Sequence, residues 1–416
     1  MTRRPFHGWY VVACCFGIAL FGWGLGFYGP SVYLVRLREA HGWSAGTISV
    51  ALTCFNLVMA VLLVQAGDII ARWGARRVIL AGSFGLAAGA ACLPIVATLW
   101  QLYVVLLVMA LGYGVSGGAA ISAILAEWFD ARRGLAISLA LLGASVAGIV
   151  VTPAMIWLTG RFGFAPGLWL LIAAMCALLW PAALATLRRP RAADSVEPTV
   201  GVAVAAVPPL PRAQLLADRA LQSIAVAFGL GLSAQSGFLI HQVAFLSGRI
   251  GLDAAAAGVA LTTTMAVLSR LVTGLVIDRF DPRHTAVANF LAQIAALSVL
   301  LAAPSPLWIY LGCALFGVSV GNMITLPNLI VQREFASAHF ARAVSLTWAI
   351  VLFVVAFGPG VLGVVHDLSG SYAAALVVCL GLDGVACAAV LVRRPMDRTG
   401  VSAMASGPQP DQDAGR

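Results

Sequence analysis

The sequence predicts an all-α integral membrane protein with twelve transmembrane helices arranged as two six-helix halves. Three observations support this fold class: an oily composition, apolar windows that recur along the chain, and an internal repeat. Of the 416 residues, 61% are hydrophobic and 10% are charged, and the mean hydropathy is +0.97, beyond what a soluble core needs. Apolar runs of this length do not alternate as barrel strands do, so the spans are helical.

The apolar windows define the twelve helices in order. Each is about 18–25 residues or longer, enough to cross roughly 30 Å of hydrocarbon as a helix. They fall at residues 9–33, 46–67, 78–97, 100–126, 134–158, 166–187, 218–246, 254–277, 285–303, 306–331, 342–365 and 371–392. The pair Arg3-Arg4 before the first window imitates a signal peptide, but eleven further spans and the absence of a clear cleavage site indicate an uncleaved first helix.

Basic residues set the orientation. The chain has no Lys, and its 25 basic residues are all Arg. With both termini in the cytoplasm, twenty Arg lie inside, one lies within the membrane, and four lie outside: Arg36, Arg38, Arg161 and Arg249. The positive-inside rule favours this arrangement. We therefore expect a multi-pass protein of the cell membrane. Its net charge of +9 reflects its contact with the bilayer and not binding to nucleic acid.

Two polar segments divide the chain. Residues 188–217 carry Arg188-Arg189-Pro190-Arg191 and Pro208-Pro209, which predicts a cytoplasmic linker between an N-terminal half, 1–187, and a C-terminal half, 218–392. The tail, 393–416, is polar and rich in Gly, Pro and Asp, which is typical of disorder.

The two halves repeat at a shift of 207 residues. This shift maps Gly67, Arg72, Gly74 and Arg76 onto Gly274, Arg279, Asp281 and Arg283, and Glu127-Trp128 onto Glu334-Phe335. The same shift brings Pro153 to within one residue of Pro359. One shift that holds across most of each half indicates duplicated units, with a substrate site between them near the membrane midplane.

These repeated loops resemble the signature loops of the major facilitator superfamily of transporters. Gly67-Asp68-Ile69-Ile70-Ala71-Arg72 is similar to the first copy and Gly274-Leu275-Val276-Ile277-Asp278-Arg279 to the second, although the expected Asp of the first copy is Ala71. The resemblance implies that the loops hold and release the two halves on the cytoplasmic side. The expected gating residues are Gly67, Asp68, Arg72, Gly74, Arg76, Arg133, Gly274, Asp278 and Arg279.

Within that superfamily, the chain is most similar to the monocarboxylate transporters and the oxalate/formate antiporter-like proteins. The similarity rests on Gly8-Trp9, Gly42-Trp43-Ser44, the segment from Trp128 to Ala136, and Asp367-Leu368-Ser369-Gly370-Ser371-Tyr372. It implies that Arg270 binds a substrate carboxylate. The chain departs from the group at Ala266, where an acidic residue is expected, and at Pro30 or Gly29, where the animal proteins have a Lys.

Arg270 is also singled out by its position alone. It interrupts the apolar run from Val259 to Ile277, and no Asp or Glu lies between Asp253 and Asp278. A guanidinium stays protonated, and at the centre of a membrane helix it costs at least about 2.5–3.5 kcal/mol. A bound anion would compensate. The alternative is snorkelling, because about seven residues, or roughly 10 Å, separate it from the end of its helix.

Other polar residues interrupt the predicted spans. His241 and Gln242 could contact substrate, and His241 could relay a proton; a satisfied residue at a helix interface is the alternative. Asp383 is a second possible proton carrier or a structural partner within the last helix. The remaining cavity candidates, each of which could equally join two helices, are Tyr28, Asn56, Tyr113 and Asn322.

These features predict a secondary active transporter that moves a small organic anion by alternating access, as proton symport or anion exchange. No enzyme activity, cofactor, metal or obligate protein partner is expected. The eight Cys fall inside apolar windows, which predicts small buried residues and neither a disulfide framework nor a metal site. A phosphate-binding Gly-x-x-x-x-Gly-Lys loop is impossible without Lys. The alternatives are an exporter of drugs or amphipathic metabolites, and a membrane enzyme or non-transporting sensor.

Overall fold

The computed structural model describes residues 6–129, 133–188, 211–335 and 337–392. Within these ranges, twelve helical stretches are long and apolar enough to cross a membrane, which confirms the predicted fold class. The predicted tail and most of the predicted linker lie outside the described residues. At the end of the predicted linker, residues Arg212–Ala217 form the short helix α10.

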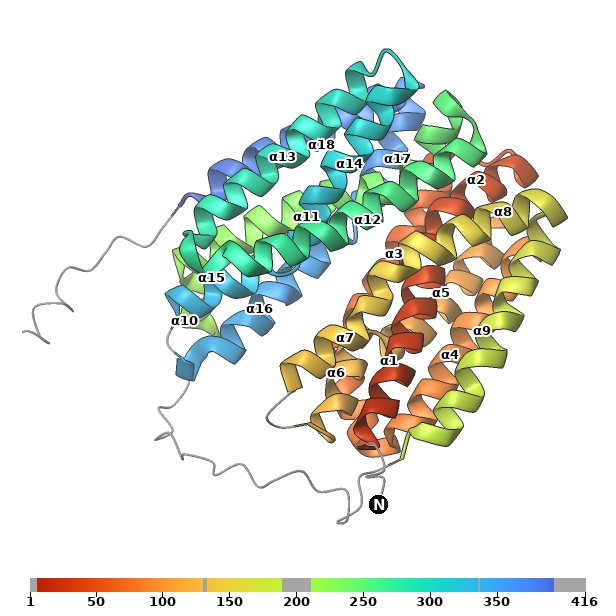
Figure 1. The fold of residues 1–416 in the computed structure, drawn as a ribbon. Coiled ribbons are helices and arrows are strands. Elements are labelled where there is room, and N and C mark those ends of the chain that lie inside the picture. Colours follow the sequence, from red (N-terminus) through yellow and green to blue (C-terminus); the bar gives the residue numbers. More distant parts are fainter. Residues whose placement is uncertain (1–5, 130–132, 189–210, 336, 393–416) are drawn as a thin grey trace, which may run out of the picture.

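The N-terminal bundle is drawn in red to yellow-green in Figure 1. Its elements are α1 (Gly8–Trp23), η1 (Gly24–Tyr28), α2 (Gly29–His41), α3 (Ala45–Trp73), α4 (Ala75–Cys92), η2 (Leu93–Ile95), α5 (Leu99–Ser116), α6 (Gly118–Ala126), α7 (Arg133–Val146), η3 (Ala147–Val151), α8 (Thr152–Phe162) and α9 (Phe164–Thr186).

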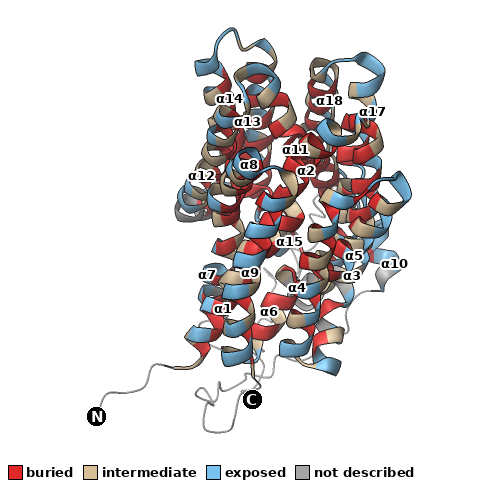
Figure 2. Cartoon of the chain, turned by 90° about the vertical axis from the view of Figure 1, so that its right-hand side faces the viewer, coloured by how far each residue is buried: buried red, intermediate tan, exposed pale blue. Residues whose placement is uncertain are grey.

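The C-terminal bundle is drawn in green to blue. It consists of α11 (Arg219–Ile250), α12 (Leu252–Val276), η5 (Ile277–Arg279), α13 (Pro282–Ala302), α14 (Pro306–Asn322), α15 (Leu326–Glu334), α16 (Ser337–Val355), α17 (Gly358–Ser369) and α18 (Tyr372–Val390). Helix α11 lies at the centre of this bundle, as shown by the burial of 89% of its most apolar window. Figure 2 shows exposed residues concentrated on the outer helices.

Two spans of the N-terminal half contain a π-helical turn just before a proline. The turn η1 precedes Pro30, and η3 precedes Pro153. Proline cannot donate a backbone hydrogen bond. The regular α-helical pattern of hydrogen bonds is therefore interrupted in the turn before each proline. The two turns pack on each other, since a Cβ at Gly24 would lie 2.5 Å from Val151. The π-helical turn in each of these spans therefore has a local cause.

The two bundles meet at one end of the molecule. We call the end where α1 begins and α18 ends the terminal side, and the opposite end, with α2, α8 and α17, the far side. Figure 1 shows the two groups of ribbons together at the far side and spread apart toward the terminal side. The predicted orientation would make the terminal side cytoplasmic.

The buried apolar residues follow the same division. One cluster extends through the N-terminal bundle into far-side residues of the C-terminal bundle, such as Phe245, Leu300 and Leu376. A second, separate cluster fills the terminal side of the C-terminal bundle around Phe228 and Phe290. The halves therefore share a core at the far side, whereas at the terminal side the C-terminal half has its own.

Glycines allow α3 and α17 to cross closely at the far side. A Cβ at Gly363 would lie 2.6 Å from the Oγ of Ser49, and one at Gly360 would lie 2.5 Å from the Oγ1 of Thr53. Asp367 Oδ2 accepts a 2.7 Å hydrogen bond from the backbone N–H of Gly46. Small residues that let helix backbones approach are a usual device of membrane interfaces.

The cysteine prediction needs one correction. All eight Cys are free thiols, but four of them are not buried: Cys176 and Cys387 are half-buried, and Cys54 and Cys92 are exposed. The two exposed residues lie on helices of the N-terminal bundle, and a helix that faces lipid on one side can expose a small apolar residue there without cost.

Candidate functional site

Arg270 lies on α12 where the two halves meet. Its Nε donates a 2.9 Å hydrogen bond to the carbonyl oxygen of Gly321 in α14, and its Nη1 lies 3.5 Å from the Oγ of Ser145 in α7. Gly321 must be small, because a Cβ there would lie 2.2 Å from the carbonyl oxygen of Ala266. The side chain is half-buried, and in the described part of the chain no carboxylate pairs with it.

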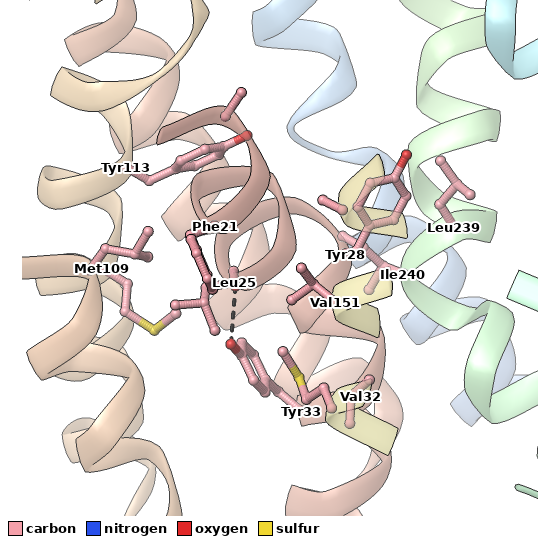
Figure 3. Close-up of a cluster of buried hydrophobic side chains, with 14 of the residues drawn as sticks. Phe21, Leu25, Tyr28, Val32, Tyr33, Met109, Tyr113, Val151, Leu239 and Ile240 are labelled. Atoms are coloured by element: carbon pink, nitrogen blue, oxygen red, sulfur yellow. Dashed lines mark hydrogen bonds between the residues drawn. The ribbon is translucent and has the colours of Figure 1, made fainter. Parts of the chain in front are cut away.

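Tyr28 lies near Arg270, and Tyr113 lies near Tyr28. Tyr28, at the end of η1, is close enough to interact electrostatically with both Arg270 and Tyr113. Figure 3 shows the Tyr28 ring directed toward α11, beside Leu239 and Ile240, and Tyr113 projecting from α5. Among the described residues neither hydroxyl has a hydrogen-bond partner. Tyr33, in contrast, donates its hydroxyl proton to the carbonyl oxygen of Leu25 at 3.1 Å.

Packing holds Tyr113 against the first span. Its ring lies over two glycines, since a Cβ at Gly26 would come within 2.8 Å of the ring and one at Gly22 within 3.5 Å. It also makes an edge contact with Trp23, with the ring centroids 5.7 Å apart. The glycine-rich first span therefore holds Tyr113 near Tyr28, which in turn lies near Arg270.

Asn56 lies on the face of α3 that meets the C-terminal half. Ser49, Thr53 and Asn56 are spaced by four and three residues, so they share one helix face. Ser49 and Thr53 contact α17, and Asn56 follows one turn nearer the terminal side. It is half-buried, and its amide makes no hydrogen bond to another described residue. An amide in this position can contact a ligand between the halves.

His241 is placed in the far-side contact between the halves. Its Nε2 lies 3.1 Å from the Oγ of Ser49 and 3.1 Å from the carbonyl oxygen of Pro359, and its Nδ1 lies 3.4 Å from the hydroxyl of Tyr372. The ring is 1% exposed, so both nitrogens are used within the protein. Of the two interpretations of His241 offered above, this geometry corresponds to a hydrogen-bonded residue at a helix interface and not to a substrate contact.

Two other predicted cavity residues join helices within the C-terminal half. Gln242 donates to the Oγ1 of Thr262 at 2.8 Å, and Asn322 donates to the Oγ of Ser269 at 2.8 Å. Both side chains are buried. Both amides therefore have partners within their own half, although Asn322 directly follows Gly321, which binds Arg270. We call the group formed by Arg270, Tyr28 and Tyr113 the arginine–tyrosine site.

Asp383 is remote from that site and fully buried within α18. Both of its carboxylate oxygens accept from the Nε2 of Gln293 in α13, at 2.9 and 3.1 Å. Gln293 in turn accepts from the Oγ of Ser319 at 3.1 Å. These bonds connect three helices of one half, as expected for a structural partner.

The signature loops lie on the terminal side. Asp68, Arg72, Arg76 and Arg279 are exposed. Gly74 separates α3 from α4 at a φ of +83°, which a side chain would strain. Gly67, Arg133, Gly274 and Asp278 belong to helices or turns, but the surroundings of these four positions fall outside the description.

Sequence reasoning missed an ion pair on the same side. Arg283, 1% exposed, donates to both carboxylate oxygens of Glu334, with Nη2 at 2.8 Å, and to the Oγ of Ser223 at 3.0 Å. It also donates to the carbonyl oxygens of Val390 and Val392 at the end of α18. Arg283 and Glu334 both belong to the internal repeat, and this was the sequence feature that could have drawn attention to them. The repeat does not show, however, which of its residues contact each other.

The arrangement is that of a membrane transport protein: two six-helix halves meet around a charged site and close at one end. The family model of the Major Facilitator Superfamily matches residues 14–359, and the chain belongs to this superfamily. The class expected from the signature loops is thereby confirmed. Among the described residues, no group of three or more His, Cys, Asp or Glu could hold a metal ion.

Comparison with solved structures supports the same fold. The nucleoside transporter NupG is similar at a TM-score of 0.71 and 15% identity, covering 96% of this chain and 99% of that one. A bacterial homologue of the human lysosomal transporter Spinster, in an inward-facing and unoccupied conformation, is similar at a TM-score of 0.74 and 13% identity, with 93% and 97% covered. No curated protein matches the chain in sequence.

Proposed function

We propose that this transporter moves a small organic anion, a monocarboxylate, across the cell membrane by alternating access. The observation that carries the proposal is Arg270: a charged guanidinium at the junction of the two halves, with no carboxylate partner among the described residues. A buried charge of this kind needs compensation. A substrate carboxylate supplies it.

The surroundings of Arg270 suit a carboxylate. Its Nε is used by the carbonyl oxygen of Gly321, which orients the guanidinium plane, whereas Nη1 has only the long contact to Ser145 and Nη2 has no described partner. A guanidinium offers paired N–H donors that match the two oxygens of a carboxylate. The hydroxyl of Tyr28 adds a further donor near Arg270.

The apolar neighbours favour a short organic chain on that carboxylate. Leu239 and Ile240 are buried and flank Tyr28, and Phe55 stacks on Tyr113 with the ring centroids 6.4 Å apart. Apolar walls with a few oriented polar groups are typical of small-molecule sites. The monocarboxylate group resemblance points to the same ligand class.

The placement of Arg270 also suits a cycle between two conformations. Its helix, α12, packs on α7, η3 and α8 of the other half. An anion that neutralises the guanidinium removes the cost of moving an unpaired charge, so the loaded carrier interconverts faster than the empty one. This behaviour supports proton symport or anion exchange, and His241, which joins α3 to α17, is the candidate proton site.

The test is uptake of labelled monocarboxylates into proteoliposomes, together with thermal stabilisation of the purified protein by a panel of carboxylates. Arg270→Gln should abolish uptake and the stabilisation, whereas Arg161→Gln, an exposed arginine on the far side, should leave both unchanged. If no carboxylate stabilises the wild type in an Arg270-dependent manner, the monocarboxylate proposal fails.

The second candidate function is export of drugs or amphipathic metabolites. The aromatic and aliphatic walls around Tyr28 and Tyr113 favour it, because they accept large apolar solutes as readily as a short acid. The same stabilisation panel should therefore include amphipathic drugs and, because one structural neighbour is a nucleoside transporter, nucleosides. Stabilisation by these compounds that survives Arg270→Gln would favour the exporter. A non-transporting sensor would show binding without uptake.

A further inference from the structure

The N-terminal half has a basic pocket on the terminal side. It lies between the start of α4, the end of α6 and the end of α9, and its volume is about 540 Å³. Its charged lining consists of Arg76, Arg77, Arg188 and Glu127, so the arginines outnumber the carboxylate by two. None of the residues of the arginine–tyrosine site lines this pocket.

The repeat places the Arg283–Glu334 pair at the equivalent position of the C-terminal half. The shift of 207 residues maps Arg76 onto Arg283 and Glu127 onto Glu334. It also maps the end of α9 onto the end of α18, whose carbonyl oxygens at Val390 and Val392 accept from Arg283. In the C-terminal half, an internal carboxylate and three further acceptors occupy the guanidinium.

At the equivalent position of the N-terminal half, the arginine and the glutamate do not pair with each other. Arg76 is exposed, and neither it nor Glu127 makes an ion pair within the described part of the chain. The hydroxyl of Ser223, which accepts from Arg283 at 3.0 Å, has no equivalent because position 16 is Phe16. One half therefore closes the position with its own residues, and the other leaves the donors of Arg76 available.

Two further features of the pocket favour a phosphate. Helix α4 begins there, its N-cap Gly74 provides no side-chain cap, and the first backbone N–H groups of the helix have no partner within it. The guanidinium of Arg188 lies 5.3 Å from the ring of Trp128, which positions it. Arginines together with a helix N-terminus form a site for a tetrahedral oxyanion.

The position of the pocket indicates where the phosphate comes from. Trp73, which is 69% exposed, lines it. Exposed tryptophans at the end of a membrane-spanning helix gather at the depth of the lipid headgroups. Basic pockets between transmembrane helices at this level bind anionic headgroups.

We propose that this pocket binds the phosphate of an anionic phospholipid. Arg76 and Arg77 hold the phosphate oxygens, and the bound headgroup joins α4, α6 and α9 as the Arg283–Glu334 pair joins the corresponding helices of the other half. Glu127 lowers the affinity, because its charge repels the ligand.

Titration of the purified protein in detergent with dioleoylphosphatidylglycerol, followed by native mass spectrometry and thermal unfolding, tests the proposal. Dioleoylphosphatidylcholine and inorganic phosphate are the comparison ligands. Each lost arginine should reduce the apparent affinity about fivefold, so Arg76→Gln/Arg77→Gln should weaken phosphatidylglycerol binding roughly 25-fold. Glu127→Gln should strengthen it. The matched control is Arg219→Gln, an exposed arginine of the same side outside the pocket.

Equal phosphatidylglycerol binding by the wild type and the double variant would overturn the proposal. Equal stabilisation by phosphatidylcholine would overturn it too, because the anionic charge would then be irrelevant. Stabilisation by inorganic phosphate that depends on Arg76 and matches that of the lipid would show a soluble oxyanion instead of a headgroup.

Discussion

The Nη1 of Arg270 in α12 lies 3.5 Å from the Oγ of Ser145 in α7, so the charged side chain of one half reaches a hydroxyl of the other. This distance is at the outer limit of a hydrogen bond. The guanidinium therefore contacts both halves while most of its donor capacity on the Nη atoms stays free for a ligand.

Substitutions at these two residues should differ widely in effect. Arg270→Lys keeps the charge but loses the planar donor fork and the orienting bond to Gly321, so we expect at least tenfold weaker transport. Ser145→Ala removes only a long neutral contact, worth less than about 1 kcal/mol, and should change apparent affinity less than fivefold. Initial uptake rates across substrate concentrations measure both. A larger effect of Ser145→Ala would make this serine a substrate contact.

Closure of the far side should depend on the close crossing of α3 and α17. Gly363→Ala places a methyl group against Ser49 and the carbonyl oxygen of Ala45, 3.0 Å away, and should open the far side. Distances between spin labels on α3 and α17 should lengthen. Gly381→Ala, where nothing lies within 4 Å, is the control. Unchanged distances in both variants would show that this crossing does not hold the halves together.

The C-terminal ion pair should stabilise the fold far more than its repeat counterpart. Arg283→Ala leaves Glu334 without its partner and should cost about 3–5 kcal/mol, somewhat less because Glu334 is 25% exposed. Arg76→Ala alters an exposed side chain and should stay within about 0.5 kcal/mol in lipid-free detergent. Thermal unfolding of both variants provides the comparison, and similar midpoints would contradict the asymmetry between the halves.

Asp383 should act structurally and not as a proton carrier. Asp383→Asn keeps an acceptor for Gln293 and should retain both stability and uptake. Asp383→Leu leaves the buried Gln293 amide without this acceptor and should destabilise by about 1–3 kcal/mol. Loss of proton-driven uptake in a stably folded Asp383→Asn protein would assign the carboxylate to coupling instead.

The terminal side should face the cytoplasm. Twenty arginines lie on that side in the predicted topology, and the positive-inside rule then fixes both termini inside. An alkaline phosphatase fused after Arg416 should be inactive in intact cells, and a fluorescent protein at the same point should be bright. The reverse pattern would invert the topology.

Most of the fold followed from the sequence, because long apolar windows have no other stable form in a bilayer. The sequence also identified Arg270 as an unpaired charge within a span. The candidate site was harder to predict. Helical spacing shows which residues share a face, but not which helix covers that face, and so His241 and Asn322 looked as available for a ligand as Tyr28 and Asn56.

The sequence by itself determined the class of protein, the spans, the repeat and the charge that needs a partner, since these depend on hydrophobicity and on order along one chain. Only the tertiary structure decided which polar groups stay available: it engaged His241 with Ser49 and Pro359 and brought Tyr28 near Arg270. It also made the repeated arginines unequal, burying Arg283 and exposing Arg76. The physical reason is that hydrogen bonds and burial arise from contacts between distant segments, and packing alone brings those segments together.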